Sequence, residues 1–173
     1  MFYEIKPGGD RDILVLGPDG AVSPFLATEH DERVPRISPD GRWVAYLSEQ
    51  TGDTRVYVQP FPECGPVTEV SAGPGMEPVW ASDGRALFFR DGSRVLRVPV
   101  ETGGATLAVD RPELLFDAPY VRDSLVVGNP AYDVGPDGRL LMVRREDGTG
   151  AGALQIAVVL DWFSEVEARV PHQ

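Results

Sequence analysis

Three segments of the chain share one motif, in which Asp-Gly-Arg opens a run of mostly apolar residues. They read SPDGRWVAYLS from Ser38, ASDGRALFFRD from Ala81 and GPDGRLLMVRR from Gly135, and they align without gaps. The turn glycines Gly41, Gly84 and Gly138 are 43 and 54 residues apart. A repeat of about 40 to 45 residues is typical of a propeller blade made of four strands.

The Asp-Gly pair in each copy is the usual signal of a tight β-hairpin. The aspartate can accept a hydrogen bond from the nearby backbone, and the glycine can adopt the positive φ that such a turn requires. We therefore interpret Asp40, Asp83 and Asp137 as turn residues rather than as metal ligands or catalytic acids. Each is followed by its turn glycine, which is Gly41, Gly84 or Gly138.

The run after each turn is apolar on both faces of an extended strand. In the first copy Trp43, Ala45 and Leu47 would lie on one face, with Val44 and Tyr46 on the other. A strand with one face in water would alternate between apolar and polar residues. We therefore predict an inner strand that is buried between two neighbouring sheets.

Further apolar segments complete a unit of four strands. TRVYVQPF from Thr54 and SRVLRVPV from Ser93 read as third strands, and segments 67–71 and 113–116 are candidate fourth strands. The sequence thus predicts an all-β fold, a single β-propeller domain over residues 1–173 with antiparallel four-stranded blades. We expect blades at about 1–28, 34–72, 77–116 and 130–160, followed by a short helix at 161–170.

This arrangement amounts to roughly three and a half blades, whereas closed propellers usually have four to eight. We therefore expect a partial propeller with open blade edges. Such edges and uncovered apolar faces favour self-association.

The balance of charge limits the partners. The chain has 27 acidic and 16 basic residues and a net charge of −11, which opposes binding to nucleic acid or to an anionic membrane. No run of about 18 apolar residues is present. The single cysteine, Cys64, cannot form an internal disulfide, and no Cys-His pattern predicts a metal site. We expect no cofactor, and the composition leaves the compartment open.

The sequence contains no motif that would make the chain an enzyme by familiar machinery. The glycine-rich loop, His-Arg-Asp and Asp-Phe-Gly motifs of protein kinases are absent, as is the Gly-x-Ser-x-Gly motif of many hydrolases. The two histidines, His30 and His172, are far apart in the chain. GTGAGA at 148–153 fits a dinucleotide-binding pattern, but the residues after it favour a strand over a helix, so we interpret it as a connection.

The repeats ISPDGRWVAY, EPVWASDGRALFF and YDVGPDGRLLMV resemble those of TolB-type bacterial β-propellers, which share the general plan of WD-type propellers. The closing segment LQIAVVLDWFSEVEARVP, 154–171, resembles the end of the propeller region of some bacterial serine/threonine protein kinases. The resemblance implies a non-enzymatic binding or sensing module, the C-terminal part of a receptor-like kinase, which would be extracytoplasmic if the kinase spans a membrane. Two alternatives are the propeller of a hydrolase whose catalytic domain is encoded elsewhere and a TolB-like periplasmic interaction protein.

Hairpin topology predicts two rims. The three Asp-Gly-Arg turns and the turn at 17–20 would share one, the turn rim. The other, the variable rim, would hold connections of unequal length at 27–33, 48–53, 71–77, 91–93, 117–129 and 146–153. Such loops on a rigid fold commonly carry binding, here of a protein, peptide or small ligand. The candidate binding residues are His30, Asp31, Glu32, Met76, Glu77, Asp117, Tyr120, Arg122 and Asp123. Tyr120 and Arg122 belong to residue types that are enriched at interfaces.

Overall fold

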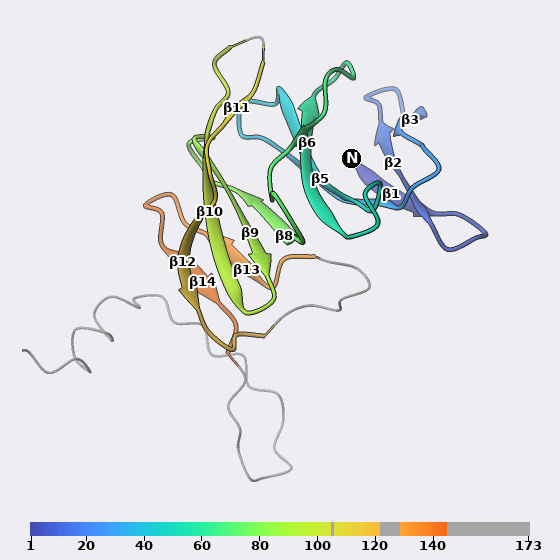
Figure 1. Cartoon of the computed structure of the whole chain (residues 1–173). Coiled ribbons are helices and arrows are strands. Elements are labelled where there is room, and N and C mark those ends of the chain that lie inside the picture. Colours follow the sequence, from blue (N-terminus) through green and yellow to red (C-terminus); the bar gives the residue numbers. More distant parts are fainter. Residues whose placement is uncertain (105, 122–128, 145–173) are drawn as a thin grey trace, which may run out of the picture.

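The computed structural model describes residues 1–104, 106–121 and 129–144 (Figure 1). All the regular secondary structure of these residues is β. It comprises fourteen strands in four antiparallel sheets. The strands of the first two sheets are β1 (Phe2–Ile5), β2 (Arg11–Leu16), β3 (Val22–Leu26), β4 (Glu32–Ile37), β5 (Trp43–Ser48), β6 (Arg55–Pro60) and β7 (Thr68–Glu69). Those of the last two are β8 (Met76–Trp80), β9 (Ala86–Asp91), β10 (Arg94–Glu101), β11 (Ala108–Val109), β12 (Glu113–Asp117), β13 (Tyr132–Val134) and β14 (Leu140–Met142).

Each sheet is built from strands that follow one another in the chain. Sheet 1 has the order β1-β2-β3 and sheet 2 the order β4-β5-β6-β7. Sheet 3 has the order β8-β9-β10-β11, with β12 also paired to β10, and sheet 4 contains β13 and β14. The predicted fourth strands at 67–71 and 113–116 correspond to β7 and β12. The third strand of sheet 3, β10, extends from Arg94 to Glu101, and its pairing with β9 ends at Pro99, which lies opposite Ala86.

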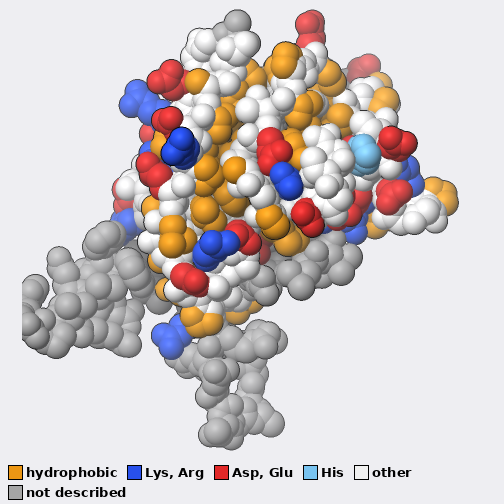
Figure 2. Space-filling model, in the orientation of Figure 1, with side chains coloured by type: hydrophobic (Ala, Val, Ile, Leu, Met, Phe, Trp, Pro, Cys, Tyr) orange, Lys and Arg blue, Asp and Glu red, His pale blue; other side chains and the backbone are white. Residues whose placement is uncertain are grey.

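The core lies between the sheets, which stack in chain order. One cluster joins sheets 2 and 3, a second joins sheets 1 and 2, and a third joins sheets 3 and 4. Sheet 2 is thus covered on one face by sheet 1 and on the other by sheet 3. Hydrophobic side chains gather over the middle of the molecule, and charged side chains lie mainly nearer its margins (Figure 2).

Strand β5 shows why its sequence has no polar face. All six residues are buried. Trp43, Ala45 and Leu47 pack toward sheet 3, whereas Val44 and Tyr46 pack toward sheet 1. The prediction of a strand buried on both faces is therefore confirmed. Burial of this kind contributes about 25 cal/mol for each Å² of apolar surface that leaves water.

The Asp-Gly-Arg turns share one hydrogen-bond pattern. The Oδ1 atoms of Asp40, Asp83 and Asp137 accept a hydrogen bond from the backbone N–H two residues later, at 3.1, 2.9 and 3.1 Å. The glycines that follow have φ of +73°, +70° and +80°. Desolvation acts to raise the pKa of Asp40, but hydrogen bonds from Ser38 and from the backbone of Arg42 lower it overall.

The third turn is one residue tighter than the first two. The N–H of Ser38 bonds to the carbonyl of Trp43, five residues later, but the N–H of Gly135 bonds to that of Arg139, four residues later. Because side chains alternate along a strand, this difference of one residue exchanges its two faces. Leu140 and Met142 therefore pack toward sheet 3. The gapless alignment of the three copies did not predict this change.

The predicted blade at 130–160 is described only as far as residue 144, and the predicted helix at 161–170 lies outside the described residues.

Candidate functional site

Contacts between sheets show which connections share an end of the strands. At one end, Arg42 Nη2 donates a hydrogen bond to the carbonyl of Gly104 at 2.7 Å, and a Cβ at Gly84 would lie 3.8 Å from Pro39. At the other end, the N–H of Gly75 donates to the carbonyl of Thr54 at 3.0 Å. The end with Arg42, Gly84 and Gly104 is therefore the turn rim, and the end with Thr54 and Gly75 is the variable rim.

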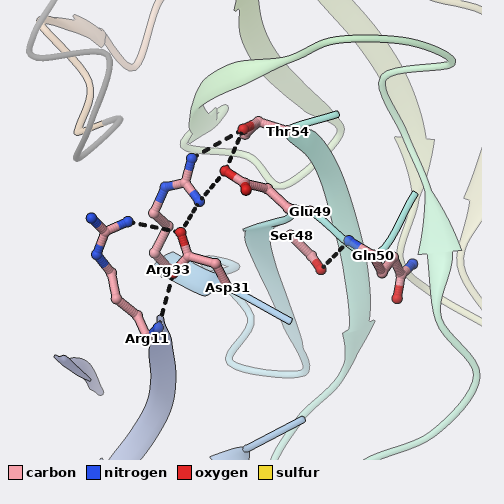
Figure 3. A network of polar contacts seen from close by, with 7 residues as sticks. All are labelled: Arg11, Asp31, Arg33, Ser48, Glu49, Gln50 and Thr54. Atoms are coloured by element: carbon pink, nitrogen blue, oxygen red, sulfur yellow. Dashed lines mark hydrogen bonds and ion pairs between the residues drawn. The ribbon is translucent and has the colours of Figure 1, made fainter. Parts of the chain in front are cut away.

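A cluster of polar side chains joins three connections at the variable rim (Figure 3). Asp31 Oδ2 accepts hydrogen bonds from Arg11 Nη1 at 2.9 Å and from Arg33 Nη1 at 2.5 Å. Arg33 also pairs with Glu49 Oε1 at 3.0 Å and donates to Thr54 Oγ1 at 3.0 Å. Thr54 Oγ1 donates in turn to Glu49 Oε1 at 2.9 Å. We call these five residues the Asp31 cluster.

The Asp31 cluster fastens sheet 1 to sheet 2. Asp31 comes from the connection between them, and its Oδ1 also accepts the backbone N–H of Arg11 on β2 at 2.9 Å. The side chain of Arg33 is 3% exposed and that of Asp31 is 14% exposed. Charges so poorly hydrated are stable only when paired. The structure therefore uses Asp31, a predicted binding residue, to hold the rim together.

The side chain of Glu32 also makes its contacts inside the protein. Its side chain is buried and accepts hydrogen bonds from the hydroxyl and the backbone N–H of Thr28. Burial raises the pKa of Glu32, against the opposing effect of the bonds from Thr28. His30, between Thr28 and Glu32, is partly exposed, and its backbone N–H bonds to Thr28 Oγ1 at 3.1 Å.

A second cluster, the Glu77 cluster, joins sheet 3 to sheet 4 and holds the connection between them. Glu77 Oε2 accepts the N–H of Ala131 at 3.1 Å and lies 3.8 Å from Arg90 Nη1. The hydroxyl of Tyr132 donates to the carbonyl of Glu77 at 2.8 Å. Arg90, which is 1% exposed, donates to the carbonyl of Val121 at 2.8 Å. A buried ion pair thus holds Val121 within the 117–129 connection and Ala131 just after it.

The remaining candidates divide into two groups. Tyr120 packs against Phe116 in a T-shaped contact at 5.8 Å, and Met76 pairs with Arg90 in the ladder, so both lie beside the Glu77 cluster. Asp117 is exposed at the end of β12. Arg122 and Asp123 lie outside the described residues.

Two arginines that organise the rim were missed by the sequence analysis. Arg33 and Arg90 occupy buried positions of strands β4 and β9. For Arg90 the available signal was a cation that follows four apolar residues of its strand, because such a residue is rarely buried without a partner. Strand β4, with the sequence ERVPRI, offers no such signal for Arg33. Nothing in the spacing identified Asp31 or Glu77 as the partner.

The innermost strands form a groove that the sequence analysis also missed. It has a volume of about 500 Å³, and its lining includes Arg36 and Ile37 from β4, Val79 and Trp80 from β8, and Tyr132 and Asp133 from β13. Trp80 Nε1 donates to the carbonyl of Arg36 at 2.9 Å, which ties β8 to β4. The groove combines an apolar floor with one cation and one anion.

Among the described residues, no group of three His, Cys, Asp or Glu side chains has a geometry that could hold a metal ion. No helix in the described part of the chain is long and apolar enough to cross a membrane.

Many solved structures are similar to this one. The TolB candidate from Agrobacterium tumefaciens matches with a TM-score of 0.57 and 21% identity, over 82% of this chain and 52% of that one. The similarity shows the fold alone, that of a TolB-like β-propeller. TolB from Acinetobacter baumannii matches at 0.46 and 15% identity, over 80% and 44% of the two chains. A protein from Lactobacillus plantarum matches at 0.42 and 16% identity, over 78% and 50%.

The chain spans about half the length of the structures that it matches. No protein-family model matches the sequence, and no curated protein matches it.

Proposed function

We propose that the chain is a non-enzymatic interaction module that holds a protein or peptide on its variable rim. The observation that carries this proposal is the similarity of 82% of the chain to a TolB-like propeller. A propeller presents loops whose sequence the fold does not dictate on a rigid framework of strands, and binding residues are often found on such loops.

The two buried clusters support this role by fixing the loops before a partner arrives. The Asp31 cluster ties Asp31 and Glu49 together through Arg33. The Glu77 cluster holds Val121 within the 117–129 connection and Ala131 just after it. A loop that is already ordered loses less conformational entropy on binding, so more of the contact energy is retained as affinity. The rim thus combines connections of unequal length with a restrained backbone.

The exposed candidates define where contact would occur. His30 and Tyr120 are partly exposed and Asp117 is exposed. Asp31, Glu32 and Glu77 would instead contribute by holding the backbone of the loops in place. With a net charge of −11, the chain favours a partner with a cationic surface through electrostatic steering.

The experiment is a selection of random phage-displayed peptides on the purified wild-type chain. Enriched peptides should bind the wild type and lose at least about tenfold in affinity for a double variant of the rim, Asp117→Ala with His30→Ala. The matched control carries Glu63→Ala and Glu101→Ala, two exposed residues near the turn rim, and should bind as the wild type does. Peptides that bind all three proteins equally, or that are cleaved during incubation, would refute the proposal.

A finer proposal concerns the protein to which the module belongs. We infer from the resemblance of the segment 154–171 that it forms the C-terminal part of a receptor-like serine/threonine kinase. Reading the coding sequence upstream of Met1 tests this: a kinase catalytic loop supports it, whereas a hydrolase domain or a signal peptide alone would refute it.

A further inference from the structure

Sheets 2 and 3 share an unusual backbone position in their first strands, β4 and β8. Val34 and Glu77 occupy this position and lie 43 residues apart, which is the spacing of the first two turn glycines. Neither is glycine, yet both have positive φ, of +55° and +58°, and both are followed by proline. The ladder to the next strand shifts register at each of them. The two positions therefore match in backbone and differ in side chain.

A neighbouring position of the next strand differs in the same way. It holds Leu47 in β5 and Arg90 in β9, which are also 43 residues apart. Val34 and Leu47 are 2% and 0% exposed and belong to the core between sheets 2 and 3. Glu77 and Arg90 are 3% and 1% exposed, and Glu77 Oε2 lies 3.8 Å from Arg90 Nη1. Sheet 3 thus has a buried ion pair where sheet 2 has two apolar residues.

Stability alone does not favour the ion pair over apolar residues. Two charges lose their hydration when they are buried, and this cost can exceed the energy of their attraction. Sheet 2 shows that the fold accepts apolar residues at both positions. Glu77 and Arg90 are therefore better explained by a contact that only charged side chains can make.

The link that follows sheet 3 is longer than the links that follow sheets 1 and 2. It spans 118–131, between β12 and β13. The links at 27–31 and 70–75 are less than half as long. The ion pair thus belongs to the sheet that precedes the long link, whereas the apolar residues belong to a sheet that precedes a short one.

Both charged side chains bind the backbone of this long link. Arg90 donates hydrogen bonds to the carbonyls of Val121 at 2.8 Å and of Tyr120 at 3.4 Å. Glu77 Oε2 accepts the N–H of Ala131 at 3.1 Å. Valine and leucine at the same positions could make none of these contacts, because their side chains contain no donor or acceptor.

Tyr120 connects the ion pair with the proposed binding surface. Its carbonyl accepts a hydrogen bond from Arg90, and its ring packs against Phe116 with the centroids 5.8 Å apart. The residue is partly exposed at the variable rim. A shift of its backbone would therefore move an aromatic side chain of a type that is enriched at interfaces.

We propose that Glu77 and Arg90 are positioning residues for partner binding, which hold Tyr120, Val121 and Ala131 in the geometry that the partner recognises. The fold itself requires only apolar residues at the two positions. This inference rests on the proposed function of the variable rim, which it deepens by naming the pair that sets the shape of one part of that rim.

The test replaces the pair by the residues that sheet 2 has, in the double variant Glu77→Val with Arg90→Leu. Its midpoint of unfolding in urea should be close to or above that of the wild type. Each single replacement should lower the midpoint, because it removes one charge of a buried pair and leaves the other in place. The single variants thus show that the positions are buried, and the double variant shows whether the fold needs the charges.

Hydrogen exchange then measures the link directly. In the double variant the amides of Val121 and Ala131 should exchange at least about tenfold faster than in the wild type, as measured by mass spectrometry of short fragments. The amides of β5 should exchange at the wild-type rate. Random phage-displayed peptides that were selected on the wild type should bind the double variant at least about tenfold more weakly.

The matched control removes a second Glu-Arg pair of sheet 3 in the same way. Arg97 Nη1 lies 3.1 Å from Glu113 Oε2 on the exposed side of β10 and β12. Arg97→Leu with Glu113→Val should leave both the exchange of the link and the affinity for the peptides unchanged.

Three results would overturn the proposal. The double variant could unfold at a midpoint as low as the single variants, which would mean that the pair serves the fold. The exchange at Val121 and Ala131 could stay unchanged, or it could become faster while the peptides bind as before. Failure of the proposed function is distinguishable, because no selected peptide would then depend on the rim, whereas unfolding and exchange would still decide what the pair holds.

Discussion

Replacing Asp31 by alanine should destabilise the fold by about 2 to 3 kcal/mol. The carboxylate accepts three hydrogen bonds, from the side chains of Arg11 and Arg33 and from the backbone of Arg11. A hydrogen bond to a charged group contributes about 1.5 to 3 kcal/mol, and breaking a fully buried ion pair costs about 3 to 5 kcal/mol. The loss here is smaller, because Arg33 keeps Glu49 and Thr54.

The measurement is urea unfolding together with thermal melting. A loss of this size corresponds to a fall in Tm of about 4 to 12 °C for a chain of this length. The control is Glu29→Ala in the same connection, because this exposed side chain should contribute less than about 0.5 kcal/mol. A double-mutant cycle of Asp31→Ala with Arg11→Met should give a coupling of about 1 kcal/mol or more.

The reasoning would be refuted if Asp31→Ala melted like Glu29→Ala, or if the cycle showed no coupling. Either result would mean that Asp31 does not fasten the sheets and is available to a partner. The same variant therefore separates a structural role for Asp31 from the binding role that the sequence suggested.

Three further predictions concern the turns and a buried acid. Gly84→Ala should lower the free energy of unfolding, measured in urea, by about 1 to 2 kcal/mol, because φ is +70° at this position and the added Cβ meets only ordinary contacts. The control is Gly103→Ala, which should leave the free energy of unfolding unchanged, because φ is not positive there and nothing lies within 4 Å of the added Cβ. Ala72→Gly should raise Tm by a few degrees, because the exposed alanine has φ of +51°; an unchanged melt would count against strain there. Burial raises the pKa of Glu32 in the folded protein above its value in the unfolded chain. The protonated side chain therefore contributes its full stabilisation at a pH below the unfolded-state pKa, and this stabilisation is lost as the pH rises through the folded-state pKa. Glu32→Gln should therefore gain in Tm over the wild type between pH 4 and 7, and a difference that stays constant with pH would contradict this.

Much of the fold could be predicted from local patterns. The Asp-Gly pairs determine where the chain reverses, since a positive φ is accessible to glycine without the clash that a Cβ would cause. The apolar run at Trp43–Leu47 predicts burial on both faces, because exposure of either would leave large side chains in water. The spacing of the repeats then predicts antiparallel sheets that stack.

The partners of the buried charges could not be predicted in this way. Arg90 and Glu77 are 13 positions apart in the chain, and Arg11 and Asp31 are 20 positions apart. Which of the many acids lies near a given arginine depends on how neighbouring sheets are placed, and no local pattern records this.

The sequence by itself determined the turns, the strands and their burial, because these depend on the conformational preferences and hydrophobicity of residues a few positions apart. Only the tertiary structure decided that Asp31 and Glu77 hold the variable rim together, since their roles depend on distances between separate sheets. It also decided which way the apolar residues of β14 face, because a single residue less in the turn at Gly135 exchanges the two faces of the strand that follows.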